Sequence, residues 1–89
     1  MTHIVTVQGY AYDPPAIQIA SGERVKWRNL DGTRHSARRD LSPAFDTGLL
    51  SKDEESEEIV IEADPGSELE YYCQPHPQMQ GKIIVGSAK

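Results

Sequence analysis

Three side chains that bind soft metal ions stand close together near the end of the 89-residue chain: Cys73, His76 and Met79. Cys73 is the only cysteine, and Met79 is the only methionine apart from the one at position 1. Another histidine, His35, stands far upstream. Two histidines and one cysteine in a plane, with a weak axial methionine, are the ligands that proteins use to hold copper for electron transfer. The residue types and their spacing therefore point to a copper site.

Two prolines, Pro75 and Pro77, flank His76. Proline fixes φ and lacks a backbone N–H donor, so this segment is expected to be stiff. A stiff segment would hold its donor atoms in similar positions in both oxidation states of a metal, which fast electron transfer requires. The prolines thus favour an electron-transfer site over a site that hands its metal to another protein.

Short β-strands are the elements that must position these donors. Alternating apolar and polar side chains, or short β-branched runs, predict strands at residues 3–7, 17–19, 25–29, 59–61, 69–73 and 83–85. Turn signals separate them, including Asp31-Gly32, which is typical of a tight hairpin, and Asp64-Pro65-Gly66. We therefore expect an all-β fold, an antiparallel Greek-key β-sandwich of about seven to eight strands, that forms a single domain over residues 1–89.

The composition argues against several classes of protein. A single cysteine rules out an internal disulfide. No apolar run approaches the roughly 20 residues that cross a bilayer, so membrane insertion is not expected. The net charge of −5 argues against nucleic acid as a partner. The chain starts almost directly on a strand-like run, and we expect that a removed leader preceded it, which would place the protein in the periplasm or another extracytoplasmic space.

The segment Cys73-Gln74-Pro75-His76-Pro77-Gln78-Met79 resembles the copper loop of the cupredoxins, the type 1 blue copper proteins. Among them it is most similar to amicyanin and plastocyanin. The segment Phe45-Asp46-Thr47-Gly48-Leu49-Leu50 is also similar to that family, as are the turn at Pro65-Gly66 and the closing strand Gly81-Lys82-Ile83-Ile84-Val85. The resemblance covers most of the chain and implies the cupredoxin form of the β-sandwich.

The resemblance also implies one type 1 copper ion with four ligands, His35, Cys73, His76 and Met79. His35, rather than His3, stands where the upstream ligand of the family belongs. Ser36 stands where a side chain supports the cysteine and ties the two ligand segments together. Pro75 and Pro77 would form part of the apolar patch through which the loop histidine meets redox partners.

The implied function is that of a small soluble blue copper protein, which carries single electrons between redox partners by cycling between Cu(I) and Cu(II). It would meet a donor and an acceptor redox protein transiently and as a monomer. It would not be an enzyme with a substrate of its own.

Other functions could use the same residues. A copper carrier or storage protein would share the ligands but needs them labile and exposed. A cysteine-dependent hydrolase built on Cys73 needs a substrate cleft and a third orienting group, for which 89 residues offer little room. A structural zinc site is disfavoured because methionine is a poor zinc ligand. Cys73 by itself could also be an ordinary buried thiol.

Charged side chains form two groups of opposite sign. The run Asp53-Glu54-Glu55-Ser56-Glu57-Glu58 is acidic, and Arg34, Arg38 and Arg39 form a basic group. The acidic run is either a docking patch for a basic partner or a solvated loop, and such runs usually face water. Opposite charges on two parts of a molecule can also steer its partners.

Overall fold

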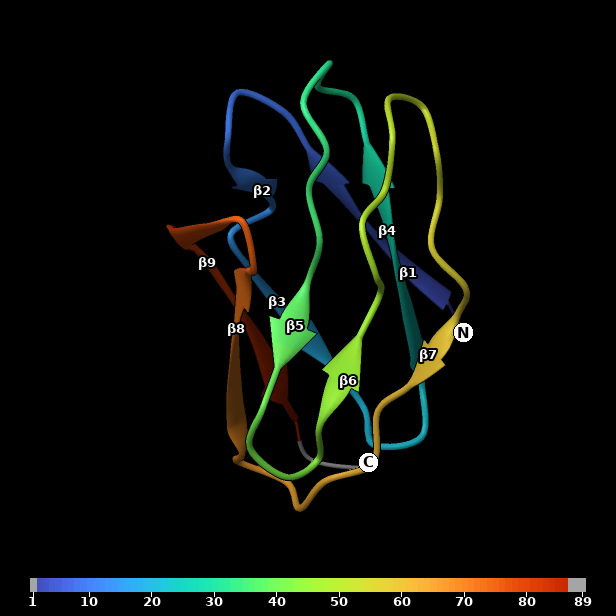
Figure 1. The fold of residues 1–89 in the computed structure, drawn as a ribbon. Coiled ribbons are helices and arrows are strands. Elements are labelled where there is room, and N and C mark those ends of the chain that lie inside the picture. Colours follow the sequence, from blue (N-terminus) through green and yellow to red (C-terminus); the bar gives the residue numbers. More distant parts are fainter. Residues whose placement is uncertain (1, 87–89) are drawn as a thin grey trace.

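The computed structural model describes residues 2–86, and in this range two β-sheets pack face to face (Figure 1). The first sheet has the order β2-β1-β4-β7, with β1 (Thr2–Val7), β2 (Tyr12–Asp13), β4 (Arg24–Asn29) and β7 (Ile59–Val60). The second has the order β3-β9-β8-β5-β6, with β3 (Ala16–Ile19), β5 (Arg38–Arg39), β6 (Phe45–Asp46), β8 (Glu68–Cys73) and β9 (His76–Val85). The predicted all-β sandwich is confirmed.

The core lies between the sheets and follows the alternation seen in the sequence. In β8, Leu69, Tyr71 and Cys73 are buried, whereas the residues between them are more exposed. Trp27 of β4 is fully buried, and its ring meets that of Tyr71 edge to face at 5.3 Å between centroids. Phe45 of β6 stacks on Trp27 at 5.4 Å. Cys73 is the last member of the buried row on β8, so the core ends at its sulfur.

The pairing of the strands departs from the antiparallel sandwich that we expected. β1 pairs with β4 in parallel, and β3 pairs with β9 in parallel, so both sheets are mixed. Between β1 and β4 the chain crosses to the second sheet to form β3, and it returns in the same direction as β1. Turn signals report local reversals and not such crossings, so the sequence pattern missed them. The structure has nine strands among residues 2–86, rather than seven to eight, because it includes two-residue strands.

The prediction of a tight hairpin at Asp31-Gly32 is wrong. After β4 the chain enters a loop and continues into β5, which belongs to the other sheet. The buried side chain of Asn29 holds this loop, because its Nδ2 donates to the carbonyl oxygens of Thr33 and Leu50 at 2.9 and 2.8 Å. Its Oδ1 accepts the N–H of Asp31 at 2.9 Å. One amide side chain thus ties this loop to Leu50 and fixes its path after β4.

The segment that carries the closely spaced donors is the end of a hairpin. Cys73 closes β8, His76 opens β9, and these two residues face each other across the ladder, where the register shifts. Farther along β9, Gly81 faces Tyr71 so closely that a Cβ atom at Gly81 would lie 2.4 Å from Cζ of that ring. A glycine is therefore required where the hairpin passes over the aromatic core.

The acidic run lies along the edge of β4, where its backbone pairs with that of Trp27 and Asn29. Glu55 forms ion pairs with Lys26 at 3.1 Å and with Arg28 at 3.5 Å, and Glu58 lies 3.5 Å from Arg24. These carboxylates thus meet cations of their own chain at the surface. The contacts favour the interpretation of the run as a solvated segment over a docking patch.

Candidate metal centre

Three donor atoms from two distant parts of the chain converge at one end of the sandwich. Nδ1 of His35 and Nδ1 of His76 each lie 3.7 Å from Sγ of Cys73, and all three atoms lie within 4.8 Å of one another. His35 comes from the loop between β4 and β5, and the other two come from the β8–β9 hairpin. His35 and Cys73 have no exposed surface, whereas His76 is half-buried.

These distances fit a single small metal ion. Bonds of about 2.0–2.3 Å from such an ion to nitrogen and sulfur place the two atoms about 3.6–3.8 Å apart when the angle at the metal is near 110–120°. Both sulfur–nitrogen distances here are 3.7 Å. A thiolate with two imidazoles in a plane is a donor set that suits copper. The residues present therefore fit the copper ion that the spacing predicted.

Met79 lies at the same end of the molecule. It is buried, with 6% of its surface exposed, although it is flanked by exposed residues on β9. Together with Tyr10, His76, Pro77 and Gln78 it lines a hollow beside the hairpin. Met79 is thus a buried thioether that lines the same hollow as a donor histidine, and its role as the fourth ligand stays a prediction.

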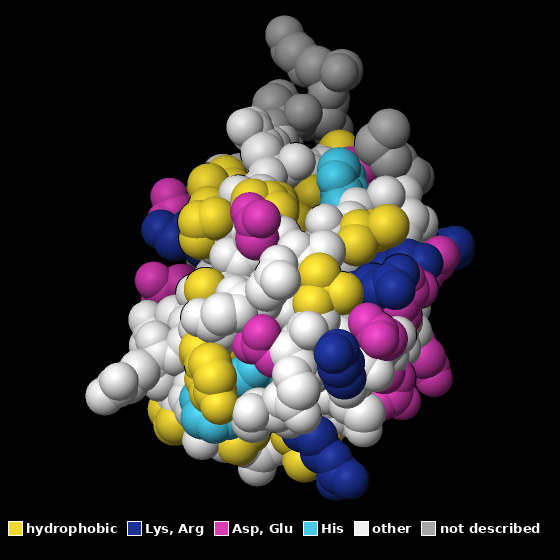
Figure 2. Space-filling view, turned by 90° about the horizontal axis from the view of Figure 1, so that it is seen from above, with side chains coloured by type: hydrophobic (Ala, Val, Ile, Leu, Met, Phe, Trp, Pro, Cys, Tyr) yellow, Lys and Arg dark blue, Asp and Glu magenta, His cyan; other side chains and the backbone are white. Residues whose placement is uncertain are grey.

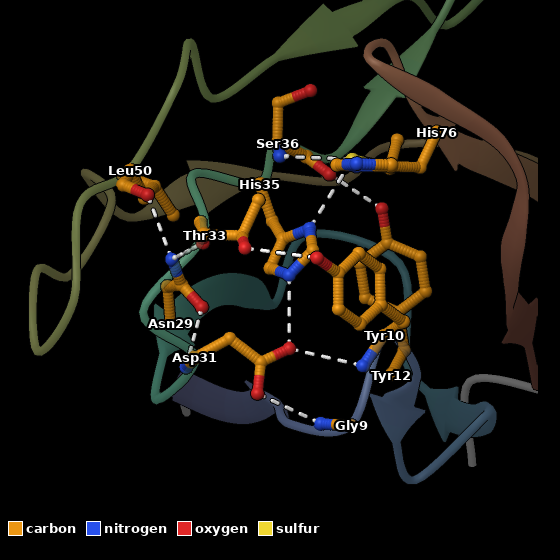
Figure 3. A network of polar contacts seen from close by, with 11 residues as sticks. Gly9, Tyr10, Tyr12, Asn29, Asp31, Thr33, His35, Ser36, Leu50 and His76 are labelled. Carbon is orange, nitrogen blue, oxygen red and sulfur yellow. Dashed lines mark hydrogen bonds and ion pairs between the residues drawn. The ribbon is translucent and has the colours of Figure 1, made fainter.

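The ring of His35 is oriented from behind by Asp31. Nε2 of His35 lies 2.9 Å from Oδ2 of Asp31, and a ring that donates at Nε2 keeps its Nδ1 lone pair for a metal (Figure 3). The backbone of His35 is held as well, because its N–H and C=O both pair with Leu50, at 3.2 and 2.8 Å. The backbone pairing with Leu50 and the ring contact with Asp31 together restrict the position of Nδ1 of His35.

The carboxyl group of Asp31 is kept ionised by its surroundings. Its burial works to raise the pKa, but backbone N–H groups of Tyr10 and Gly9 donate to it at 2.9 and 2.8 Å. These bonds, with a smaller contribution from His35, hold the pKa of Asp31 below its ordinary value of 3.8. The group behind His35 is therefore a carboxylate near neutral pH.

Ser36 makes the contacts expected of a residue that joins the two ligand segments. Its backbone N–H points at Sγ of Cys73 at 3.4 Å, and its Oγ accepts the N–H of Gln74 at 3.1 Å. Its carbonyl oxygen accepts the hydroxyl of Tyr12, a buried side chain. Burial raises the pKa of Tyr12 far above its usual range, so this hydroxyl remains a donor.

Sequence reasoning identified the donors and Ser36 but missed Tyr10, Tyr12 and Asp31. The first two lie between the predicted strands at residues 3–7 and 17–19, and Asp31 was interpreted as a turn residue. Asp31 stands four residues before His35, which is a signal that could have been noticed. His3 lies in β1 and is bonded to Glu23 at 2.8 Å, so it is not among the three residues that converge.

A β-sandwich with a cysteine and two histidines gathered at one end defines the cupredoxin class of copper proteins. The family model described as "Copper binding proteins, plastocyanin/azurin family" matches residues 2–86, and the chain belongs to this family.

Individual relatives agree with this assignment. The chain is 29% identical to an amicyanin from Paracoccus versutus, over 92% of this chain and 63% of the relative. It is 35% identical to a plastocyanin from Synechococcus sp. (strain JA-2-3B'a(2-13)), over 83% of this chain and 62% of the relative. The chain thus spans less than two thirds of the length of these two relatives.

Solved structures resemble the fold as well. The crystal structure of amicyanin from Paracoccus versutus superposes with a TM-score of 0.82 at 28% identity, and the match covers 94% of this chain and 80% of that one. The β-sandwich of this chain therefore has the same architecture as that amicyanin structure.

Proposed function

We propose that this protein is a blue copper protein that carries single electrons between redox partner proteins. One observation carries the proposal: two imidazole nitrogens, from different segments, each lie 3.7 Å from the same buried cysteine sulfur. Because the fold holds these donor atoms in place, their positions are expected to change little when the site gains or loses an electron. Copper bound there supplies the one-electron chemistry between Cu(I) and Cu(II).

The protein's own groups have distinct roles in this proposal. Cys73 provides the thiolate, and the core around it excludes water. The N–H of Ser36 points at this sulfur and withdraws charge from it, and hydrogen bonds at the cysteine tune the reduction potential. Met79 would bind the copper through its thioether, which favours the reduced state. His35 and His76 would bind it through their imidazole nitrogens.

His76 is the donor through which we expect electrons to enter and leave. It is the half-buried member of the set, and Pro75 and Pro77 are exposed on either side of it. On the face drawn in Figure 2, histidine side chains reach the surface beside hydrophobic ones. We propose that these prolines contact the donor and acceptor proteins, which bind transiently to a monomer.

Other features of the proposed carrier remain predictions. A carrier of this kind has no substrate of its own and is not an enzyme. None of residues 2–86 forms a helix that could cross a membrane. We propose a periplasmic or other extracytoplasmic location.

The proposal is tested by adding Cu(II) to the metal-free protein and recording its visible and electron paramagnetic resonance spectra. We expect an intense visible band that disappears on chemical reduction, returns on reoxidation, and is lost only slowly to a chelator. His76→Gln should abolish the band, whereas the control His3→Gln should retain it, because His3 lies outside the donor set. A colourless site that is readily stripped of copper would instead indicate a copper carrier or storage protein.

A further inference from the structure

Tyr10 packs on the rings of both donor histidines. Its ring meets His35 edge to face at 4.9 Å between centroids, and it meets His76 in the same way at 5.0 Å. Tyr10 comes from the turn between β1 and β2, far in sequence from both histidines. It is also 51% exposed, so burial in the core does not explain its position.

The backbone of Tyr10 adopts a conformation that its residue type disfavours. Its φ is 58°, and the φ of the preceding Gly9 is 65°. A left-handed conformation is uncommon for a bulky residue and persists only where the surroundings impose it. Strain of this kind gathers at sites where the placement of a side chain matters.

The hairpin turn between β1 and β2 calls for this conformation, because Gln8 and Ala11 exchange two backbone hydrogen bonds, at 3.0 and 3.2 Å, around the two-residue loop of Gly9 and Tyr10. Asp31 supports the same conformation. Its two carboxylate oxygens accept the consecutive N–H groups of Gly9 and Tyr10, at 2.8 and 2.9 Å. Successive N–H groups that point into one concavity form a nest for an anion, and here the anion is a side chain of the same protein. The carboxylate thus supports the turn that presents Tyr10.

The same oxygen of Asp31 links Tyr10 to His35. Oδ2 accepts the N–H of Tyr10 and also faces Nε2 of His35, at 2.9 Å in each case (Figure 3). At the other end of the tyrosine, its hydroxyl lies 2.8 Å from Oγ1 of Thr33, two residues before the histidine. Tyr10 and His35 are therefore held as one unit.

His76 has fewer supports of its own. Among residues 2–86, no hydrogen bond is formed to its Nε2, in contrast to His35, and its side chain is half-buried. Tyr10 is the aromatic contact that reaches it from the first sheet. The ring of His35 also lies 5.2 Å from that of His76, so without Tyr10 the ring of His76 would keep one of its two ring contacts.

We propose that Tyr10 is a positioning residue, which holds the ring of His76 in its ligand orientation before the metal binds and transmits the rigidity of the Asp31–His35 pair to the exposed donor. The inference rests on the proposed copper site.

The test compares Tyr10→Gly with Tyr10→Phe. Glycine adopts a positive φ without cost, so it removes the ring and relieves the backbone, whereas phenylalanine keeps the ring and loses only the hydroxyl. Tyr10→Asn, which also tolerates this φ, serves as a second ring-free variant should the glycine variant fold poorly. Urea unfolding of each metal-free variant establishes that the fold is retained.

Two measurements report on the histidine. In the metal-free protein, we expect the ring-proton resonances of His76 to shift and lose their fixed orientation in the ring-free variants but not in Tyr10→Phe. In the copper-loaded protein, we expect copper loss to a chelator to accelerate by about threefold to tenfold, which is what the loss of one aromatic pair is worth. The Cu(II) paramagnetic spectrum should broaden in the same variants, while Tyr10→Phe stays within about twofold of the wild type in copper loss.

The proposal is overturned if the ring-free variants match the wild type in copper loss, in the Cu(II) spectrum and in the resonances of His76. Failure of the wild-type protein to form a coloured copper site would overturn the proposed function instead. Even then, the resonances of the metal-free protein decide whether Tyr10 orients His76.

Discussion

Two histidine–carboxylate pairs occur among residues 2–86, and they differ in what the histidine does with its other nitrogen. His3 and Glu23 lie 2.8 Å apart, and His35 and Asp31 lie 2.9 Å apart, in each case through Nε2. The side chain of His3 is 24% exposed, whereas that of His35 has no exposed surface. Of these two paired histidines, only His35 has its Nδ1 near Sγ of Cys73.

The difference shows how the same contact can serve two purposes. The pair of His3 and Glu23 links β1 to the residue just before β4, and it is a partly exposed contact of the kind that contributes little to stability. The pair of His35 and Asp31 aims a donor atom at a buried sulfur. A carboxylate behind a ligand histidine fixes both the tautomer and the ring orientation.

The largest difference in stability between the two pairs is expected when each histidine is replaced by alanine. In the metal-free protein, His35→Ala is expected to lower the free energy of unfolding by about 2–4 kcal/mol, because it leaves a cavity and removes a buried hydrogen bond. His3→Ala should lower it by less than about 1 kcal/mol. Urea unfolding of both metal-free variants measures the difference, and equal losses would contradict it.

Replacing each carboxylate by its amide should have a smaller effect, and again an unequal one. Asp31 uses both oxygens, whereas both contacts of Glu23 go to Oε1. An amide has one oxygen, so Glu23→Gln can keep its contacts while Asp31→Asn turns an NH₂ group toward an N–H donor. We expect Asp31→Asn to cost about 1–2 kcal/mol of stability in the metal-free protein.

The control in that experiment is Glu23→Gln, which should leave the urea midpoint nearly unchanged. A comparable loss of stability in Asp31→Asn and Glu23→Gln would show that the use of both carboxylate oxygens by Asp31 does not account for the expected difference.

The smallest expected effect is a dependence on pH. The N–H of Ala20 and, after it, the ring of His3 hold the pKa of Glu23 below its ordinary value of 4.5. A carboxyl whose pKa is lower in the folded state stabilises the fold above the unfolded pKa, and this contribution is lost as the pH falls through the folded pKa. Glutamine does not titrate, so the stability of the wild type relative to Glu23→Gln should fall as the pH drops below 4.5. Urea unfolding of both metal-free proteins over this range measures it, and a constant difference would exclude the linkage.

Local pattern was sufficient to predict much of the fold and part of the site. The alternation in β8 placed Cys73 on the buried face, and its spacing from His76 is bridged by one hairpin turn. Those features depend on residues that are neighbours in sequence. Ser36 could be assigned only from its place relative to a known family, and its contacts with Cys73 and Gln74 agree with that assignment.

The rest depended on contacts between distant segments. The parallel pairs β1–β4 and β3–β9 follow from a crossing between the sheets, which turn residues do not predict. Tyr10 reaches the site from the β1–β2 turn, where Asp31 accepts its N–H and its ring packs on both donor histidines.

The sequence by itself determined which atoms could bind a metal, because residue type and close spacing set the donor chemistry. It did not distinguish His35 from His3 on chemical grounds, since both are histidines that stand far upstream of Cys73. Only the tertiary structure decided between them, because packing of the two sheets brings one imidazole, and not the other, to the sulfur at the end of the core.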